Sequence, residues 1–181
     1  MFDIRTVVED CRSVAAGEVS AGLMIWEMAV LPTLLNNAEC WFDIAKATVE
    51  ELEHLQTRFL KNLLAVGSGC PTPILMSETG SVLMELRILS KKLLFLHHVE
   101  SLPNSALAKQ ILDIQRQFNW PGLIRECQPF LDKYKIENVC NYSSYQWKRL
   151  VKKNILNLNK TLIIERAEEQ KYKKVDIGRR F

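Results

Sequence analysis

Apolar residues recur at helical spacing along most of the chain. The densest stretch covers residues 21–41, where apolar side chains, two tryptophans among them, follow a period near 3.6. Met24 and Met28 extend the apolar surface to most sides, so the pattern predicts a buried central helix. Pro32 lacks an amide hydrogen and crowds the preceding turn, so we expect a kink or a new helix to begin there.

Several further stretches have the same apolar period, each bounded by glycine, proline or a capping residue. The predicted helices cover residues 2–16, 49–66, 73–80 and 81–101, a segment beginning near 105, residues 123–134 and a segment beginning after 143. A short strand over residues 136–139 is conceivable but has no evident partner. The pattern therefore predicts an all-α fold, an irregular bundle of about six to eight helices.

Two helix starts carry the capping-box pattern, in which a hydroxyl and a glutamate or glutamine exchange hydrogen bonds with backbone amides. Thr48 with Glu51 is one instance, and Ser143 with Gln146 is the other. Behind the second, an apolar stripe is expected to face the core. Its members are Trp147, Leu150, Val151, Ile155 and Leu158.

The helix beginning near residue 105 reads as amphipathic. Leu107, Ile111 and Ile114 are expected to pack against the rest of the protein. The polar residues between them are expected to face solvent; they are Lys109, Gln110, Asp113 and Arg116.

Charge is distributed unevenly. Residues 1–86 contain 5 Lys/Arg and 12 Asp/Glu, a net charge of −7, whereas residues 87–181 contain 19 and 9, a net charge of +10. With the break around Gly67–Gly80, this predicts an acidic helical half over residues 1–80 and a basic helical half over 81–181, joined as one continuous domain. A polyanionic partner would explain the basic half, although attraction between the halves would explain the split equally well.

Signals for several protein classes are absent from the sequence. The start carries acids and no signal-peptide core, and no run of about 18 uncharged apolar residues predicts a membrane span. Five scattered cysteines without a Cys-x-x-Cys pair favour reduced thiols in an intracellular protein, in either nucleus or cytoplasm. Neither these cysteines nor the adjacent His97 and His98 have the spacing of metal ligands, so no metal or cofactor is expected.

Basic residues supply the remaining chemistry. Lys148, Arg149, Lys152 and Lys153 span less than two helical turns and are able to meet successive phosphates, with Tyr142, Tyr145 and Tyr172 available for stacking. The ordinary alternative is a solvated helix face. The full set of candidate nucleic-acid-binding residues is Arg87, Lys91, Lys92, Lys148, Arg149, Lys152, Lys153, Lys171, Lys173 and Lys174.

A series of motifs occurs in fixed order between about residues 17 and 175. They are Trp26-Glu27, Leu31-Pro32-Thr33-Leu34-Leu35 and Ala38-Glu39-Cys40-Trp41; Leu52, Gln56, Phe59 and Leu60; Pro71-Thr72-Pro73 with Glu78 and Gly80; Lys92, Leu93, Phe95, Leu96 and His98; and Trp147-Lys148 before a basic helix. The series resembles the region after the palm in reverse transcriptases of LINE-type (non-LTR) retrotransposons. One departure is Asn36, where that family usually has tyrosine.

The resemblance implies a thumb-like region that follows the catalytic palm and contacts the backbone of RNA, DNA or an RNA–DNA hybrid. Polymerase chemistry needs carboxylates that hold two metal ions, and the sequence has no Asp-Asp pair, so no catalytic activity is expected. The alternative is a helical protein–protein interaction module derived from a retroelement, whose exposed face binds a palm or another helical protein. Salt-sensitive binding to nucleic acid would distinguish the first function from the second.

Overall fold

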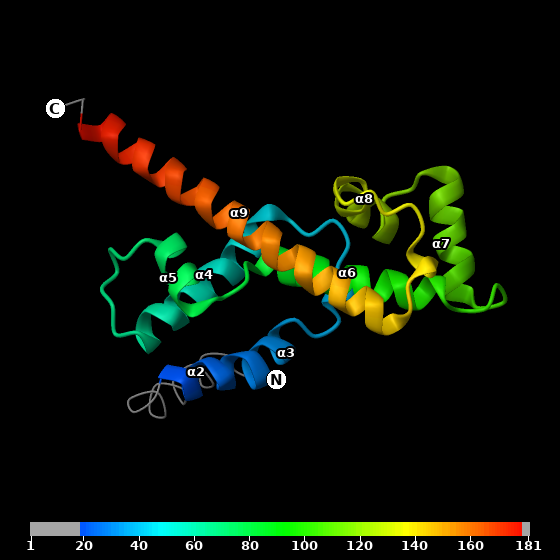
Figure 1. The fold of residues 1–181 in the computed structure, drawn as a ribbon, viewed down its shortest axis with the longest axis horizontal. Coiled ribbons are helices and arrows are strands. Elements are labelled where there is room, and N and C mark those ends of the chain that lie inside the picture. Colours follow the sequence, from blue (N-terminus) through cyan, green and yellow to red (C-terminus); the bar gives the residue numbers. More distant parts are fainter. Residues whose placement is uncertain (1–18, 179–181) are drawn as a thin grey trace. The chain divides into compact units, whose positions relative to one another are not determined.

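Helices make up most of the part of the chain that the structure describes. The computed structural model describes residues 19–178, with side chains as far as residue 169. It is 75% helical and contains no strand within those residues, which confirms the predicted all-α class (Figure 1). The strand considered over residues 136–139 is not formed. The helix predicted over residues 2–16 lies outside the described residues.

Seven helices result when the continuous helical run at residues 19–34 is counted as one, within the predicted range. The elements are α2 (Val19–Ile25), the π-helical turn η1 (Trp26–Val30), α3 (Leu31–Leu34), the 3-10 turn η2 (Ala38–Cys40), α4 (Lys46–Leu63), α5 (Thr72–Thr79), α6 (Met84–Glu100), α7 (Leu107–Phe118), α8 (Leu123–Lys133), the 3-10 turn η3 (Val139–Asn141) and α9 (Ser144–Gly178).

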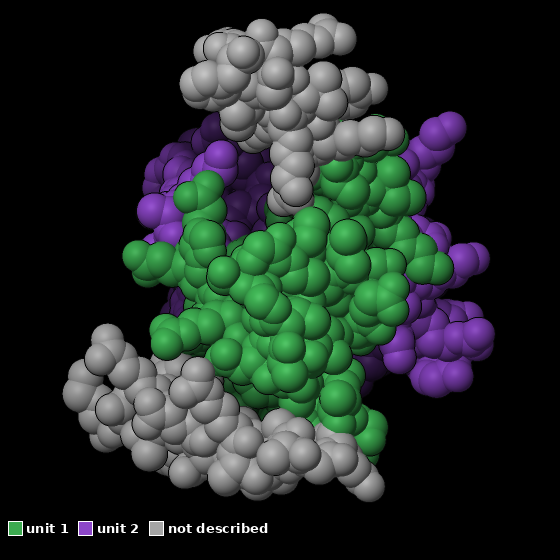
Figure 2. All heavy atoms as spheres, turned by 90° about the vertical axis from the view of Figure 1, so that its left-hand side faces the viewer, with its two compact units in different colours: residues 1–36, 50–83, 159–181 green, residues 37–49, 84–158 purple. Residues whose placement is uncertain are grey.

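The helices group into two compact units, coloured in Figure 2. Within the described chain, unit 1 contains residues 19–36, 50–83 and 159–178, and unit 2 contains residues 37–49 and 84–158. These units do not coincide with the acidic and basic halves expected from the sequence, because each unit draws segments from both sides of residue 80.

Unit 1 is built around Trp26. Its indole stacks on Phe59 of α4, with ring centroids 4.4 Å apart, and both side chains are buried. The α2 helix comes close to α4 at Gly22, where an added Cβ would lie 2.3 Å from a methyl carbon of Leu63. The prediction of a helix buried on most sides is wrong, because Met24 and Met28 are 62% and 72% exposed.

Pro32 interrupts the first helical run, as the sequence predicts. The amide of Leu31 donates to the carbonyl of Trp26, five residues earlier, so the turn before the proline is π-helical. A proline ring crowds the carbonyl four residues before it, and a wider turn relieves that crowding. The Thr33 hydroxyl then donates to the carbonyl of Ala29 at 2.9 Å.

The connection between α5 and α6 is fastened to α9 by one buried amide side chain. Asn159 Oδ1 accepts from the Leu83 amide at 3.0 Å, and its Nδ2 donates to the Ser81 carbonyl at 3.1 Å. The preceding helix ends at Gly80, as predicted, in the left-handed conformation with φ of 64°. Asn159 therefore supplies hydrogen bonds to two backbone groups in this connection, the Leu83 amide and the Ser81 carbonyl.

Unit 2 is organised around α6, which contacts α7, α8, η2 and η3. The first part of α9 packs here through the predicted stripe: Trp147, Val151 and Ile155 are buried. The Trp147 indole donates to the Leu93 carbonyl at 2.9 Å, and the His97 ring stacks on the same indole. His97 Nε2 also lies 2.8 Å from the Tyr142 carbonyl oxygen.

The two predicted capping boxes have different outcomes. At the start of α9, the Gln146 amide donates to the Ser143 hydroxyl at 3.3 Å and the Ser143 amide donates to Gln146 Oε1 at 3.0 Å, which confirms the second box. The first is wrong, because α4 begins at Lys46 and Thr48 lies inside it. The Thr48 amide donates to the carbonyl of Ala45.

The apolar side predicted to pack is not the side of α7 that faces the protein, whereas Gln110, Asp113 and Arg116 are exposed as predicted. Leu107, Ile111 and Ile114 are exposed rather than packed, and the buried residue of this helix is Leu112. Lys109, expected in solvent, faces inward with Leu112. The amphipathic pattern correctly predicts a helix here but assigns the wrong side to the core.

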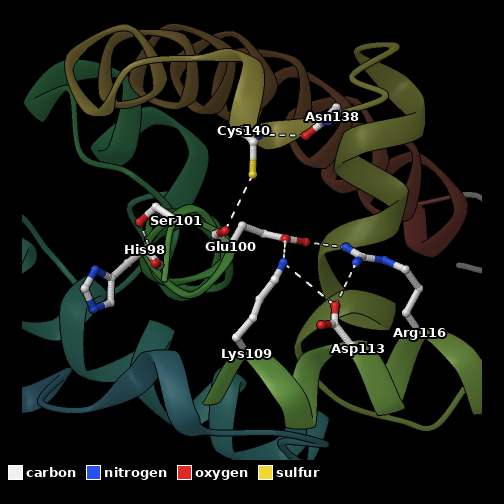
Figure 3. Close-up of polar contacts among 8 residues, drawn as sticks. All are labelled: His98, Glu100, Ser101, Lys109, Asp113, Arg116, Asn138 and Cys140. Atoms are coloured by element: carbon white, nitrogen blue, oxygen red, sulfur yellow. Dashed lines mark hydrogen bonds and ion pairs between the residues drawn. The ribbon is translucent and has the colours of Figure 1, made fainter. Parts of the chain in front are cut away.

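An ion-pair cluster explains the orientation of α7 (Figure 3). Glu100, at the end of α6, accepts hydrogen bonds from Lys109 and Arg116, and its side chain is almost fully buried. Asp113 lies 3.8 Å from Lys109 and 3.4 Å from Arg116. Because a buried carboxylate is costly without paired cations, the cluster keeps Lys109 turned toward Glu100, while Asp113 and Arg116 stay about half exposed.

Candidate nucleic-acid interface

Four of the predicted cations form one surface on α9, which we call the α9 basic face: Lys148, Arg149, Lys152 and Lys153. All four are exposed, and none forms an ion pair with another described residue. At 100° per residue, they cover an arc of roughly 140° around the helix. The structure therefore brings these four predicted residues together and leaves them open to solvent.

The buried stripe of the same helix fixes the direction of this face. Trp147, Val151 and Ile155 hold α9 against unit 2, so the residues on the remaining arc point outward. The Ser143–Gln146 capping box begins the helix one turn before the first cation. The position of the basic face thus follows from packing that the sequence already indicates.

No Asp or Glu occurs from residue 144 to 164, a feature of the sequence that supports the choice of these cations. Along the α9 basic face, from Lys148 to Lys153, the helix rises about 7.5 Å, roughly two base steps at 3.4 Å per step. Lys160, which is also exposed, lies further along α9 in unit 1 and is not assigned to this face.

An aromatic side chain lies within the basic arc. Tyr145 is 68% exposed, and the Arg149 guanidinium carbon lies 5.7 Å from its ring centroid. Beside them is a shallow depression of about 400 Å³, whose lining residues are Asn141, Tyr142, Tyr145, Gln146, Arg149 and Leu150. An exposed ring beside a guanidinium is a suitable surface for stacking a base or sugar.

The candidate cations on α6 do not form a comparable surface. Lys92 is buried, paired with Glu126, and lies under the Phe42 ring at 5.8 Å, so its assignment to a nucleic-acid surface is corrected to a structural ion pair. Lys91 is partly exposed and lies 3.9 Å from Glu39. Arg87 is partly exposed and also has an interaction within the protein.

The remaining three candidates lie further along α9. The backbone at Lys171, Lys173 and Lys174 is helical, but their side chains lie outside the described residues, as does that of Tyr172. The candidate interface is therefore defined by the α9 basic face together with Tyr145, all within unit 2.

A second cavity, of about 430 Å³, lies beside the Glu100 cluster, between residues of α6, α7, α8 and η3. Burial alone would raise the pKa of the Glu100 carboxyl, but the hydrogen bonds from Lys109 and Arg116 outweigh burial and lower it. The Cys140 thiol, at the cavity wall, donates to the Glu100 carbonyl at 3.7 Å. The cationic groups here are already occupied by carboxylates, which disfavours this cavity as an anion site.

Comparison with known proteins yields no relative: no family model, curated protein or solved structure matches the chain. Among the residues that the structure describes, none of the helices combines the length and the apolar character needed to cross a membrane.

Proposed function

We propose that this chain is a non-catalytic nucleic-acid-binding module, which contacts the phosphate backbone of RNA, DNA or their hybrid through the α9 basic face. The observation that carries the proposal is the cluster of exposed cations Lys148, Arg149, Lys152 and Lys153, unpaired with any described carboxylate. The resemblance to the thumb of LINE-type reverse transcriptases supports the same function and suggests a retroelement origin.

Binding of this kind is expected to be independent of sequence. Lysine and arginine on a helix exterior contact phosphate oxygens, which carry no base information. Each neutralised phosphate releases a counterion, so the affinity falls as the salt concentration rises. Tyr145 adds a stacking contact that any base is able to use.

The test is reversal of the charge on the α9 basic face. In the test variant, Lys148, Arg149, Lys152 and Lys153 are all changed to Glu. Its affinity for a 20-base-pair RNA–DNA hybrid should fall about a hundredfold or more, because four attractive contacts become repulsive. Fluorescence anisotropy at 50 mM salt measures the affinity, and circular dichroism confirms that the helices persist.

The matched control makes the same change of net charge elsewhere. Arg58, Arg125, Lys133 and Lys135 are exposed cations outside α9, and changing them to Glu alters the net charge equally. This control should retain most of the affinity. Equal losses in the two variants would show that only net charge matters, and an unchanged affinity in the α9 variant would remove the proposed surface.

A second candidate function is protein–protein interaction, and it rests on α7. This helix exposes an apolar stripe that a chain acting only through its cations would not need. Binding through that stripe would be insensitive to salt, so a filter-binding titration at two salt concentrations separates it from backbone binding.

A further inference from the structure

The outward face of α7 is apolar, which is unusual for a helix face that is exposed to solvent. Four apolar side chains at spacings of four, three and four residues form it: Leu107, Ile111, Ile114 and Phe118, which are 71%, 47%, 41% and 57% exposed. Trp120, just beyond the helix, is 58% exposed and its ring lies 5.8 Å from that of Phe118. We call these five residues the α7 stripe. We propose that the α7 stripe pairs, antiparallel, with the same stripe of a second copy of this chain.

The orientation of α7 prevents the stripe from being buried within its own chain. At 100° per residue, Lys109 and Arg116 lie on the other side of the helix from the stripe. Figure 3 shows both joined to Glu100. Rotating α7 to bury the stripe would leave the Glu100 carboxylate without its cations, which is strongly unfavourable. Among the residues that the structure describes, no other segment covers the stripe, which leaves it open to a second molecule.

The spacing of the stripe makes it complementary to itself. In an antiparallel pair with a two-fold axis between residues 112 and 113, Leu107 meets Phe118 of the second copy and Ile111 meets Ile114. Alternating spacings of three and four residues are those of helices that pack side by side with interlocking side chains. A surface in which each residue meets its counterpart under a two-fold rotation is what a symmetric dimer requires.

The absence of charge around the α7 stripe also favours a second copy of this chain as the partner. The residues that border the stripe on α7 are Ala108, Gln110, Gln115 and Gln117, all uncharged. Bringing two such faces together creates no repulsion between like charges. Because no cation lies in the stripe or on this border, the face does not suit a nucleic acid, and the proposal is independent of backbone binding.

The exposed area sets the expected strength. A large apolar side chain that is about half exposed presents on the order of 100 Å², so five of them bury roughly 500 Å² per copy and about 1,000 Å² in the pair. That total is at the lower limit for a specific interface. We therefore expect a reversible dimer with a dissociation constant of about 10–100 μM rather than a permanent one.

The experiment measures mass against concentration for the full chain. Sedimentation velocity at protein concentrations from 1 to 300 μM should show a monomer that becomes a dimer as the concentration rises. The dimer should not dissociate in 1 M salt. Ile111→Glu with Ile114→Glu should weaken association at least tenfold, because two carboxylates per copy would enter the pair. A wild-type chain that stays monomeric at 300 μM, or assembles beyond dimers, overturns the proposal.

A matched control places the same charges on another exposed apolar surface. Met24→Glu with Met28→Glu replaces two residues that are 62% and 72% exposed on α2 and η1, and it should dimerise as the wild type does. Association lost equally in both variants would contradict a role for α7. Circular dichroism verifies that both variants are folded, and both should bind a hybrid duplex at nanomolar protein concentration as the wild type does.

Discussion

Glu100 determines which side of α7 faces the protein. Its carboxylate is fixed at the end of α6 and is hydrogen-bonded by Lys109 and Arg116, so the side of α7 that carries Lys109 and Leu112 turns inward. The hydrogen bond that Lys109 donates to Glu100 in turn raises the pKa of Lys109, against the lowering effect of burial. A charge network thus overrides the apolar pattern at this helix.

Replacing Glu100 by Gln should lower the free energy of unfolding by about 2–3 kcal/mol at pH 7, the size of a hydrogen bond to a charged group. The folded-state pKa of Glu100 is lowered, so its contribution is complete above the ordinary value of 4.5 and is lost as pH falls through the folded-state pKa. The difference between wild type and variant should therefore shrink below pH 4.5. Urea unfolding at pH 7, 5, 4 and 3 measures it.

The control for this prediction is Glu78→Gln, which removes an exposed carboxylate of α5. It should change the unfolding free energy by less than about 0.5 kcal/mol at every pH. A pH-independent difference between wild type and Glu100→Gln would mean that packing, not ionisation, is what the substitution disturbs.

Single polar residues were the least predictable part of the fold. Asn159 looks like one more polar position on a lysine-rich helix, yet it is buried and serves the backbone at Leu83 and Ser81. Lys92 looks like its neighbour Lys91, yet only Lys92 is buried in an ion pair. Both outcomes depend on residues distant in the sequence, which a periodicity does not contain.

At the scale of elements, the start of α9 was predictable because its signals are local. The capping box, the stripe behind it and the cations between them all lie between Ser143 and Leu158, and the structure forms the box and buries Trp147, Val151 and Ile155 of the stripe. The direction of α7 was not predictable, because it depends on Glu100 in another helix. The sequence thus determined the candidate interface better than it determined the packing of α7.

Removing the α9 cap should cost about 1 kcal/mol. Ser143→Ala leaves the Gln146 amide without its hydroxyl acceptor, whereas Ser143→Asp keeps an acceptor there. We expect thermal unfolding to show a lower midpoint for the alanine variant and an unchanged or higher one for the aspartate variant. Equal midpoints in all three proteins would mean that packing of Trp147 alone holds the helix start.

At the scale of the whole molecule, net charge is a poor guide to function. The chain carries only +3, because the −7 of residues 1–86 offsets much of the +10 of residues 87–181. The two compact units do not follow this division, so the charge of a half does not describe a surface. The relevant quantity for binding a polyanion is the local run of α9 cations, which no acidic residue interrupts from residue 144 to 164.

The salt dependence of binding counts these local contacts directly. The four cations of the α9 basic face, each neutralising one phosphate, predict a slope of log affinity against log salt of about −3.6 on duplex and about −2.8 on a single strand. Lys153→Ala should make the duplex slope less steep by about 0.9, because one contact is lost. Lys133→Ala, which changes the net charge equally outside α9, should leave the slope unchanged. Equal shifts of the slope for both variants in anisotropy titrations from 50 to 300 mM salt would mean that the polyanion responds to total charge, and that Lys153 makes no contact of its own.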